Sequence, residues 1–170
     1  MNSNKNLVFL GMMGSGKSSI GNLVSKKLGL PFIDIDNSIE ESSGMSISEI
    51  FKTKGEDYFR KLEEKITLKS LKKIKNVISL GGGGFINDKI RNEIITNHYS
   101  FWLNWNESVL IKRIKDSKKR PIALKSTERE IKAIIKSRSK IYINAQYKIN
   151  CNKLTKTEIV KNIIKIYEFN

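Results

Sequence analysis

Residues 11–18 read GMMGSGKS, and this stretch decides the fold. It matches the phosphate-loop pattern G-x-x-x-x-G-K-[ST] at every fixed position. The apolar run LVFL (7–10) precedes it as a buried strand would, and a helical pattern opens at Ser18 and ends at Gly29. A strand, a glycine-rich turn and a helix in this order are the context that a phosphate loop needs. We therefore predict a nucleoside triphosphate site here.

Each part of this loop has a physical task. The glycines let the chain curl, so that successive N–H groups and the helix N-terminus point at phosphate oxygens. Lys17 adds a full positive charge that reaches the outer phosphates, and the Ser18 hydroxyl is placed to bind Mg²⁺. The loop predicts the phosphate donor but does not name the acceptor.

Strand and helix patterns alternate along the rest of the chain. Further strands are predicted at 31–36, 76–80, 99–103 and 147–151. Helices are predicted over 38–74 with breaks near Gly44 and Gly55, and over 87–96, 106–116, 127–142 and 156–168. Ser46 and Glu49 form a predicted capping box. The order predicts an α/β fold: a three-layer α/β/α sandwich with a five-stranded parallel sheet. The length of 170 residues predicts one domain over 1–170.

The charge is strongly basic, with Lys+Arg 32 against Asp+Glu 17 and a net charge of +15. Such a balance raises nucleic acid or an anionic membrane as alternative partners. The densest basic stretch, KRIKDSKKRPIALK (112–125), holds no aromatic residue, whereas a single-strand binder would interleave stacking rings with its charges. The lysines are spread thinly along the chain, which indicates a bias in amino-acid composition. We therefore expect no nucleic-acid partner.

Targeting and redox signals are weak. The longest apolar runs fall far short of the ~20 residues that span a bilayer, so no membrane partner is expected. The N-terminus lacks a basic leader followed by a long apolar stretch. The single cysteine, Cys151, permits no intrachain disulfide and is predicted to be a small core residue. These features predict a cytoplasmic protein.

Two acidic residues end the second predicted strand, FIDID (32–36). Asp34 and Asp36 are two apart, so on a strand they would project from one face, ~7 Å apart. Ligands bind at the carboxyl ends of strands in open α/β sheets, where Mg²⁺ could engage the first carboxylate through water and sugar-like hydroxyls the second. The alternative is a pair of acids at a solvated strand end.

Two further stretches bear on the acceptor. In FRKLE (59–63), Arg60 has Glu63 and Glu64 one turn away, which fits either a surface ion pair or a planar fork for a carboxylate; spacing alone leaves both open. In SLGGGGF (79–85), four glycines follow the third strand, and four would not be needed for a flexible turn. Their missing side chains would let a flat small molecule rest against backbone N–H groups. A polyol carrying a carboxylate would use all these elements.

The ordered set GMMGSGKS, DID, FRKLE, LGGG, KKRP and a later arginine followed by a tyrosine resembles the shikimate kinase family, from about Leu7 to the closing helix. The resemblance implies a nucleoside-monophosphate-kinase-like α/β fold and transfer of the ATP γ-phosphoryl group to the 3-hydroxyl of shikimate, a step toward chorismate and the aromatic amino acids. It implies ATP as co-substrate, Mg²⁺ as cofactor and a monomer. It also implies a substrate-binding region at 36–62 and a lid at 115–126.

The resemblance also assigns residues. Catalysis would fall to Lys17, Asp36 and Arg120. ATP would be bound by Gly14, Ser15, Gly16, Lys17, Ser18, Ser19, Arg113, Arg120 and Lys153, with Arg113 and Lys153 on the adenine side. Shikimate would be bound by Asp36, Arg60, Gly81, Gly82, Gly83 and Arg138. Mg²⁺ would be bound by Ser18, with Asp34 supporting it.

Some positions depart from the family pattern. The lid reads RPIAL where RPLL is usual, Gln146 stands where an alanine is common, and Gly84 extends the usual three glycines. These changes leave the adenine contacts near 145–156 open. Trp102 is predicted to be core, and Trp105, at a strand-to-helix turn, is a candidate to line the site. The nearest rival is a gluconate or nucleoside monophosphate kinase, although a nucleotide acceptor would favour more arginines and a base slot.

Overall fold

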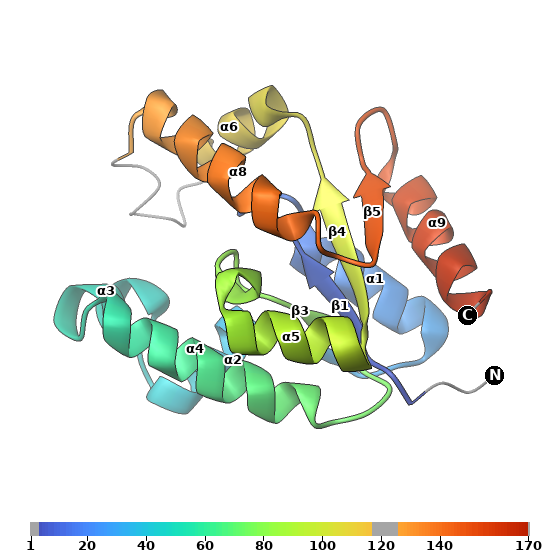
Figure 1. Cartoon of the computed structure of the whole chain (residues 1–170), viewed down its shortest axis with the longest axis horizontal. Coiled ribbons are helices and arrows are strands. Elements are labelled where there is room, and N and C mark those ends of the chain that lie inside the picture. Colours follow the sequence, from blue (N-terminus) through green and yellow to red (C-terminus); the bar gives the residue numbers. More distant parts are fainter. Residues whose placement is uncertain (1–3, 117–125, 170) are drawn as a thin grey trace.

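The computed structural model describes residues 4–116 and 126–169. Its strands are β1 (Leu7–Leu10), β2 (Phe32–Asp34), β3 (Val77–Ser79), β4 (Tyr99–Asn104) and β5 (Tyr147–Asn150). They form one five-stranded sheet in the order β2-β3-β1-β4-β5, with every neighbouring pair parallel (Figure 1). The predicted five-stranded parallel sheet is confirmed.

The helices of the described residues alternate with these strands. They are α1 (Lys17–Leu28), α2 (Ile35–Ser43), α3 (Ile47–Thr53), α4 (Glu56–Leu71), the 3₁₀ turn η1 (Gly84–Ile86), α5 (Asp88–Asn97), α6 (Glu107–Lys115), α8 (Glu128–Tyr142) and α9 (Lys156–Glu168). The predicted helical stretch 38–74 is three helices, with Gly44 ending α2 and Gly55 preceding α4. The Ser46–Glu49 capping box at the start of α3 is confirmed.

Helices cover both faces of the sheet and make three layers, as predicted (Figure 1). Alternate side chains of β1 enter different cores because successive strand residues point to opposite faces. Leu7 and Phe9 pack with α1 and α9. Val8 and Leu10 pack in the larger core with α2, α3, α4, α5, α6 and α8. Every residue of β1 is at most 1% exposed, the continuous apolar burial that a central parallel strand requires.

The central strand β1 lies between β3 and β4, and this order positions the site. Loops leave the carboxyl ends of all three strands: the phosphate loop after β1, the glycine run after β3 and Trp105 after β4. Parallel strands share one carboxyl edge, so these loops meet there although they are far apart in sequence.

One local prediction is wrong. The second strand ends at Asp34, and α2 begins at Ile35, so Asp34 and Asp36 do not project from one strand face. Asp34 caps α2, since its Oδ1 accepts hydrogen bonds from the N–H groups of Asp36 (3.1 Å) and Asn37 (3.3 Å). An aspartate side chain can accept hydrogen bonds from the free N–H groups at the start of a helix. The alternating pattern of FIDID predicts a strand and does not indicate this cap. Asp36 instead stands in the first turn of the helix.

His98, the chain's one histidine, is buried before β4, and its Nδ1 accepts a hydrogen bond from the Asn6 N–H (3.4 Å). Burial lowers the pKa of His98, against the raising effect of Glu93, while Lys5 adds to the lowering. The folded protein therefore protonates the His98 imidazole less readily than the unfolded chain does. We therefore expect the contribution of His98 to the free energy of unfolding to be fully present above about pH 6.5. This contribution should be lost as the pH falls toward and through the lowered pKa.

Urea unfolding at about pH 7.5 and pH 5.5 would measure this effect, with His98→Gln as the comparison. The variant should lose less stability between the two pH values than the parent chain. Equal losses in both proteins would show that His98 does not cause the pH dependence.

Three other expectations concern Cys151, membrane-spanning helices and the number of domains. Cys151 is fully buried, as predicted, and burial raises the pKa of its thiol to about 12. Across the described residues, none of the helices combines the length and apolar character that crossing a bilayer requires. The expectation of one domain over 1–170 stays a prediction.

Candidate active site

The phosphate loop curls around the N-terminus of α1. Gly16 precedes the helix with φ 88° and ψ 18°, a left-handed conformation that side-chain-bearing residues rarely adopt. The Lys17 ammonium is buried inside the loop and donates to the carbonyls of Gly11 (2.9 Å) and Met12 (3.1 Å). These two hydrogen bonds hold the ammonium group inside the loop. Ser18 and Ser19, the next two helix residues, are exposed.

Two features anchor the phosphate loop: the larger hydrophobic core and Trp105. Met12 is 3% exposed and packs into the larger core. Trp105 donates its Nε1–H to the carbonyl of Ser15 (2.9 Å), and the Arg113 guanidinium lies 3.9 Å from the centre of the Trp105 ring. Arg113 also donates to the carbonyl of Gly14 (3.3 Å). The two side chains therefore anchor consecutive carbonyls of the loop. Trp105 thus contacts the phosphate loop, and its role in lining the site stays a prediction.

We expect Trp105→Phe to raise the KM for ATP by about three- to tenfold, because the Ser15 carbonyl loses its donor and the loop becomes less ordered. The KM for the acceptor should stay within about twofold, since the acceptor side is built from other elements. Steady-state kinetics would measure both constants. Trp102→Phe is the matched control, because the Trp102 ring packs on Tyr142 instead. An unchanged KM for ATP in Trp105→Phe would contradict the anchoring role.

Residues at the carboxyl ends of β1, β2 and β3 fit a magnesium ion. The Ser18 hydroxyl lies 3.4 Å from the Ser79 hydroxyl, and Ser79 pairs with Asp34 across β3 and β2. Within the described part of the chain, no group of three or more His, Cys, Asp or Glu side chains could hold a metal ion. Mg²⁺ does not require one, because it keeps several waters and shares its remaining positions with substrate phosphates. Ser79 is a neighbour of this site that the sequence did not single out.

Side chains from α2 and α4 lie very close to the glycine run. A Cβ on Gly81 would lie 2.5 Å from Glu63 Oε1 and 2.7 Å from Asp36 Oδ1, distances at which something must shift. A Cβ on Gly83 would meet the Arg60 guanidinium. The sequence predicted close approach by a small molecule. In this structure the atoms that approach Gly81 and Gly83 belong to Asp36, Arg60 and Glu63, and approach by a ligand stays a prediction. A Cβ on Gly84 would make only ordinary van der Waals contacts, the nearest at 3.6 Å.

Arg60 is half-buried between two carboxylates of its own helix. Its Nη1 donates to Glu63 (2.7 Å), and its Nη2 (3.1 Å) and Nε (3.2 Å) donate to Glu56. The pair with Glu63 is not a surface ion pair, since Glu63 is only 2% exposed. Burial raises the pKa of the Glu63 carboxyl, against the lowering effect of Arg60, and the neighbouring Asp36 adds to the rise. The spacing in FRKLE places Glu63 near Arg60 but does not predict its burial, because that burial comes from the packing of α4 against the glycine run.

Arg138, on α8, approaches the glycine run from the opposite side. Its Nη1 donates to the carbonyl of Gly82 (3.0 Å), and the Tyr142 hydroxyl donates to the same oxygen (2.5 Å). The α-carbon of Gly82 also faces the phosphate loop, because a Cβ there would lie 3.5 Å from the Met13 nitrogen. The structure thus brings Arg60, Arg138 and the glycine run together beside the phosphate loop.

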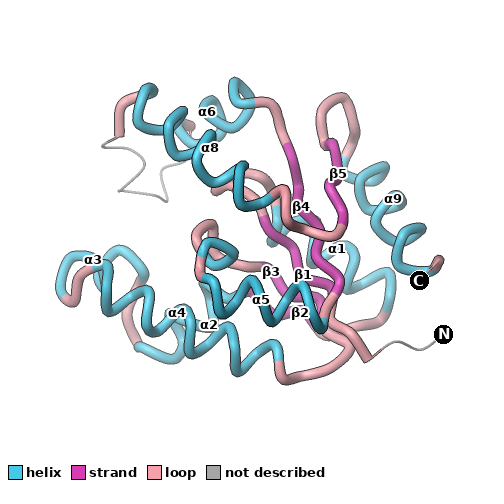
Figure 2. The backbone as a smooth tube through the Cα atoms, viewed as in Figure 1, coloured by secondary structure: helices cyan, strands magenta, loops and turns pink. Residues whose placement is uncertain are grey.

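A cavity of about 510 Å³ opens between α4 and α8. In Figure 2 the connection from β3 to α5, which contains η1, lies between these two helices. The cavity is lined by Glu56, Arg60, Glu63, Gly83, Ile86, Asn87, Ser137, Arg138 and Ile141. It therefore holds both guanidinium groups predicted to bind a carboxylate. Asp36 and Gly82 lie next to its lining residues.

The remaining predicted residues lie toward the nucleotide side. Arg120 and most of the predicted lid, 115–126, lie outside the described residues. Arg113 is exposed beside the loop, as an adenine contact requires. Lys153 is exposed in the turn after β5 with φ 63°. That turn reaches α6 through Asn152, whose Oδ1 accepts from the Asn106 N–H (2.8 Å). The adenine roles of Arg113 and Lys153 stay predictions.

Comparison with known proteins agrees with this geometry. The family model for shikimate kinase matches residues 13–168. A shikimate kinase of Thermodesulfovibrio yellowstonii is 39% identical over 165 residues, covering 96% of this chain and 95% of the relative. The crystal structure of shikimate kinase from Aquifex aeolicus superposes with a TM-score of 0.86 at 38% identity, covering 96% of each chain. The structure of the Acinetobacter baumannii shikimate kinase in complex with shikimate gives a TM-score of 0.91 at 26% identity, covering 98% of this chain and 94% of that one. Because the match extends over nearly the whole sequence, this chain belongs to the shikimate kinase family.

Proposed function

We propose that this chain transfers the γ-phosphoryl group of ATP to the 3-hydroxyl of shikimate, forming shikimate 3-phosphate and ADP on the way to chorismate and the aromatic amino acids. One observation carries the proposal: two guanidinium groups, an aspartate and a side-chain-free run of backbone meet beside a phosphate loop. These groups suit a ring that carries both hydroxyls and a carboxylate. Family membership over nearly the full length supports the same acceptor.

Acceptor binding is divided among three elements. Arg60 on α4 and Arg138 on α8 supply planar donors for the carboxylate, and Asp36 accepts hydrogen bonds from ring hydroxyls. Gly81, Gly82 and Gly83 let the ring approach the backbone. The Asp36 carboxylate stands in the first turn of α2, where the helix N-terminus favours negative charge. Asp36 orients the 3-hydroxyl and accepts its proton as the hydroxyl oxygen attacks.

Phosphoryl transfer needs alignment and positive charge more than covalent help from the protein. Lys17 leaves its carbonyl partners, Gly11 and Met12, to bind the outer phosphates, and the loop N–H groups bind the rest. Ser18 would hold Mg²⁺, and Asp34 would support it. When bound, the ion neutralises charge on the β- and γ-phosphates. Arg120 supplies further positive charge, as the family resemblance implies.

The function is tested by ADP release from ATP with and without shikimate, using gluconate and nucleoside monophosphates as competing acceptors. We expect release that depends on Mg²⁺ and shikimate and is at least tenfold faster than with any other acceptor. Lys17→Met controls for contaminating kinases. A preference for gluconate or a nucleoside monophosphate would overturn the assigned acceptor and leave the phosphate loop assigned. A cytoplasmic monomer without a nucleic-acid or membrane partner stays our expectation.

A further inference from the structure

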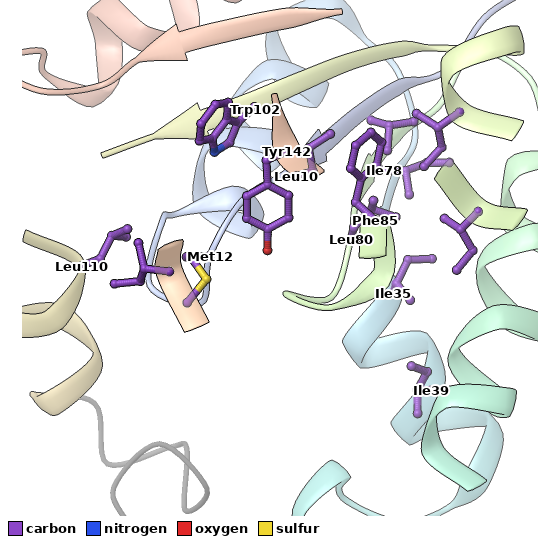
Figure 3. Close-up of a cluster of buried hydrophobic side chains, with 14 of the residues drawn as sticks. Leu10, Met12, Ile35, Ile39, Ile78, Leu80, Phe85, Trp102, Leu110 and Tyr142 are labelled. Atoms are coloured by element: carbon purple, nitrogen blue, oxygen red, sulfur yellow. The ribbon is translucent and has the colours of Figure 1, made fainter. Parts of the chain in front are cut away.

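Tyr142, the last residue of α8, carries a buried hydroxyl at the edge of the acceptor site. The residue is 1% exposed, and its hydroxyl donates to the carbonyl of Gly82 at 2.5 Å. Figure 3 shows the ring among apolar side chains with its hydroxyl pointing away from Trp102, whose ring centre lies 6.0 Å from that of Tyr142. Phenylalanine would fill this apolar space equally well. The hydroxyl is therefore the part of Tyr142 that packing does not explain.

The Gly82 carbonyl receives two donors, Tyr142 Oη and Arg138 Nη1. A carbonyl oxygen has two lone pairs, so these donors use its accepting capacity fully. No peptide bond of the described residues is cis, and in a trans peptide the N–H of Gly83 points opposite to the carbonyl of Gly82. Fixing this carbonyl toward α8 therefore fixes the direction of the Gly83 N–H.

The N–H groups next to this carbonyl are available to a ligand. Backbone bonds within the run join the Gly84 N–H to Gly81 and the Ile86 N–H to Gly83. In the part of the chain that the structure describes, no hydrogen bond is found from the N–H of Gly82 or Gly83. Glycine peptides reorient easily, so a run of four needs an external tie to keep these donors in place.

We propose that Tyr142 is a positioning residue for acceptor binding: its hydroxyl holds the Gly82 peptide in one orientation and joins the glycine run to Arg138 through a shared carbonyl. The inference rests on the proposed function and adds to it a residue that does not touch the acceptor. Burial raises the pKa of Tyr142 to about 12, so the hydroxyl remains a donor throughout the neutral range.

The test is Tyr142→Phe, which removes one oxygen and keeps the ring. We expect the KM for shikimate to rise about tenfold, while kcat and the KM for ATP change less than about threefold, because the phosphate loop keeps its own anchors. A purely structural role would lower the melting temperature without separating the two KM values. An unchanged KM for shikimate would overturn the proposal.

Tyr99→Phe is the matched control. Tyr99 is also buried, at 6% exposure, but it packs edge-on against Tyr167 in the core under α1 and α9. Removing the Tyr99 hydroxyl should leave the KM for shikimate and the KM for ATP unchanged. Equal rises in the KM for shikimate in the two variants would also overturn the proposal. If the parent chain itself shows no shikimate-dependent ADP release, the proposed function fails first, and that outcome is distinct from a failure of the Tyr142 role.

A measurement on the parent chain keeps the proposal falsifiable should Tyr142→Phe not fold. In proton NMR of the free protein, the Tyr142 hydroxyl should appear as a slowly exchanging signal, since it is buried and hydrogen-bonded. Shikimate should shift the Gly82 and Gly83 amide signals while the hydroxyl stays protected. A rapidly exchanging hydroxyl, or unmoved glycine amides, would contradict the positioning role.

Discussion

Replacing Asp36 with asparagine is expected to lower kcat for shikimate phosphorylation by about 10²- to 10⁴-fold, while ATP still binds. The carboxylate oxygen lies beside Gly81, within the acceptor side of the site. Asparagine keeps the size and one acceptor atom but cannot take the proton of the attacking hydroxyl, and lost general-base catalysis has this magnitude. ATP affinity should stay within about threefold, because the phosphate loop is untouched. Steady-state kinetics and calorimetric ATP titration would measure both quantities.

The control for Asp36→Asn is Asp57→Asn. Asp57 also stands in the first turn of a helix, α4, and is exposed, so the change removes the same charge at an equivalent local position. Its kcat should stay within about twofold of the parent value. Normal turnover by Asp36→Asn would remove this aspartate from the chemistry and leave it at most an acceptor-binding role.

The second large effect is expected from Gly81→Ala. The added methyl group would meet Glu63 Oε1 and Asp36 Oδ1 at once, and Glu63 is buried with little room to withdraw. Both carboxylates must then move, and the geometry set by Arg60 and Asp36 moves with them. Displacements of about 1 Å at a reacting centre cost about 10²-fold, so we expect a loss of at least this size in kcat/KM for shikimate.

Gly84→Ala is the comparison within the same glycine run. A Cβ on Gly84 meets its nearest neighbour at 3.6 Å and its backbone lies in the 3₁₀ turn η1, so alanine fits there. We expect kcat/KM to stay within about threefold. If both alanine variants lost activity equally, the requirement would lie in the flexibility of the run and not in the contacts of Gly81.

Much of the molecule could be predicted because local chemistry determines it. GMMGSGKS predicts its own turn and the helix after it, since glycines at 11, 14 and 16 take positive φ values and Lys17 opens α1. Apolar runs and glycine breaks predict the strands and the division of 38–74 into three helices. The predicted end of the second strand, at Asp36, was wrong. The strand ends at Asp34, which caps α2 through a hydrogen bond that hydrophobic periodicity does not contain.

The sequence by itself determined the phosphate loop, the alternation of strands and helices, and the family, because each rests on residues close together or on their order along the chain. Only the tertiary structure decided that Glu63 is buried against the glycine run, that Trp105 holds the loop after β1, and that Tyr142 and Arg138 share the Gly82 carbonyl. These contacts join residues 18 to 90 positions apart, and their burial and direction follow from the packing of α4, α6 and α8 over one edge of the sheet.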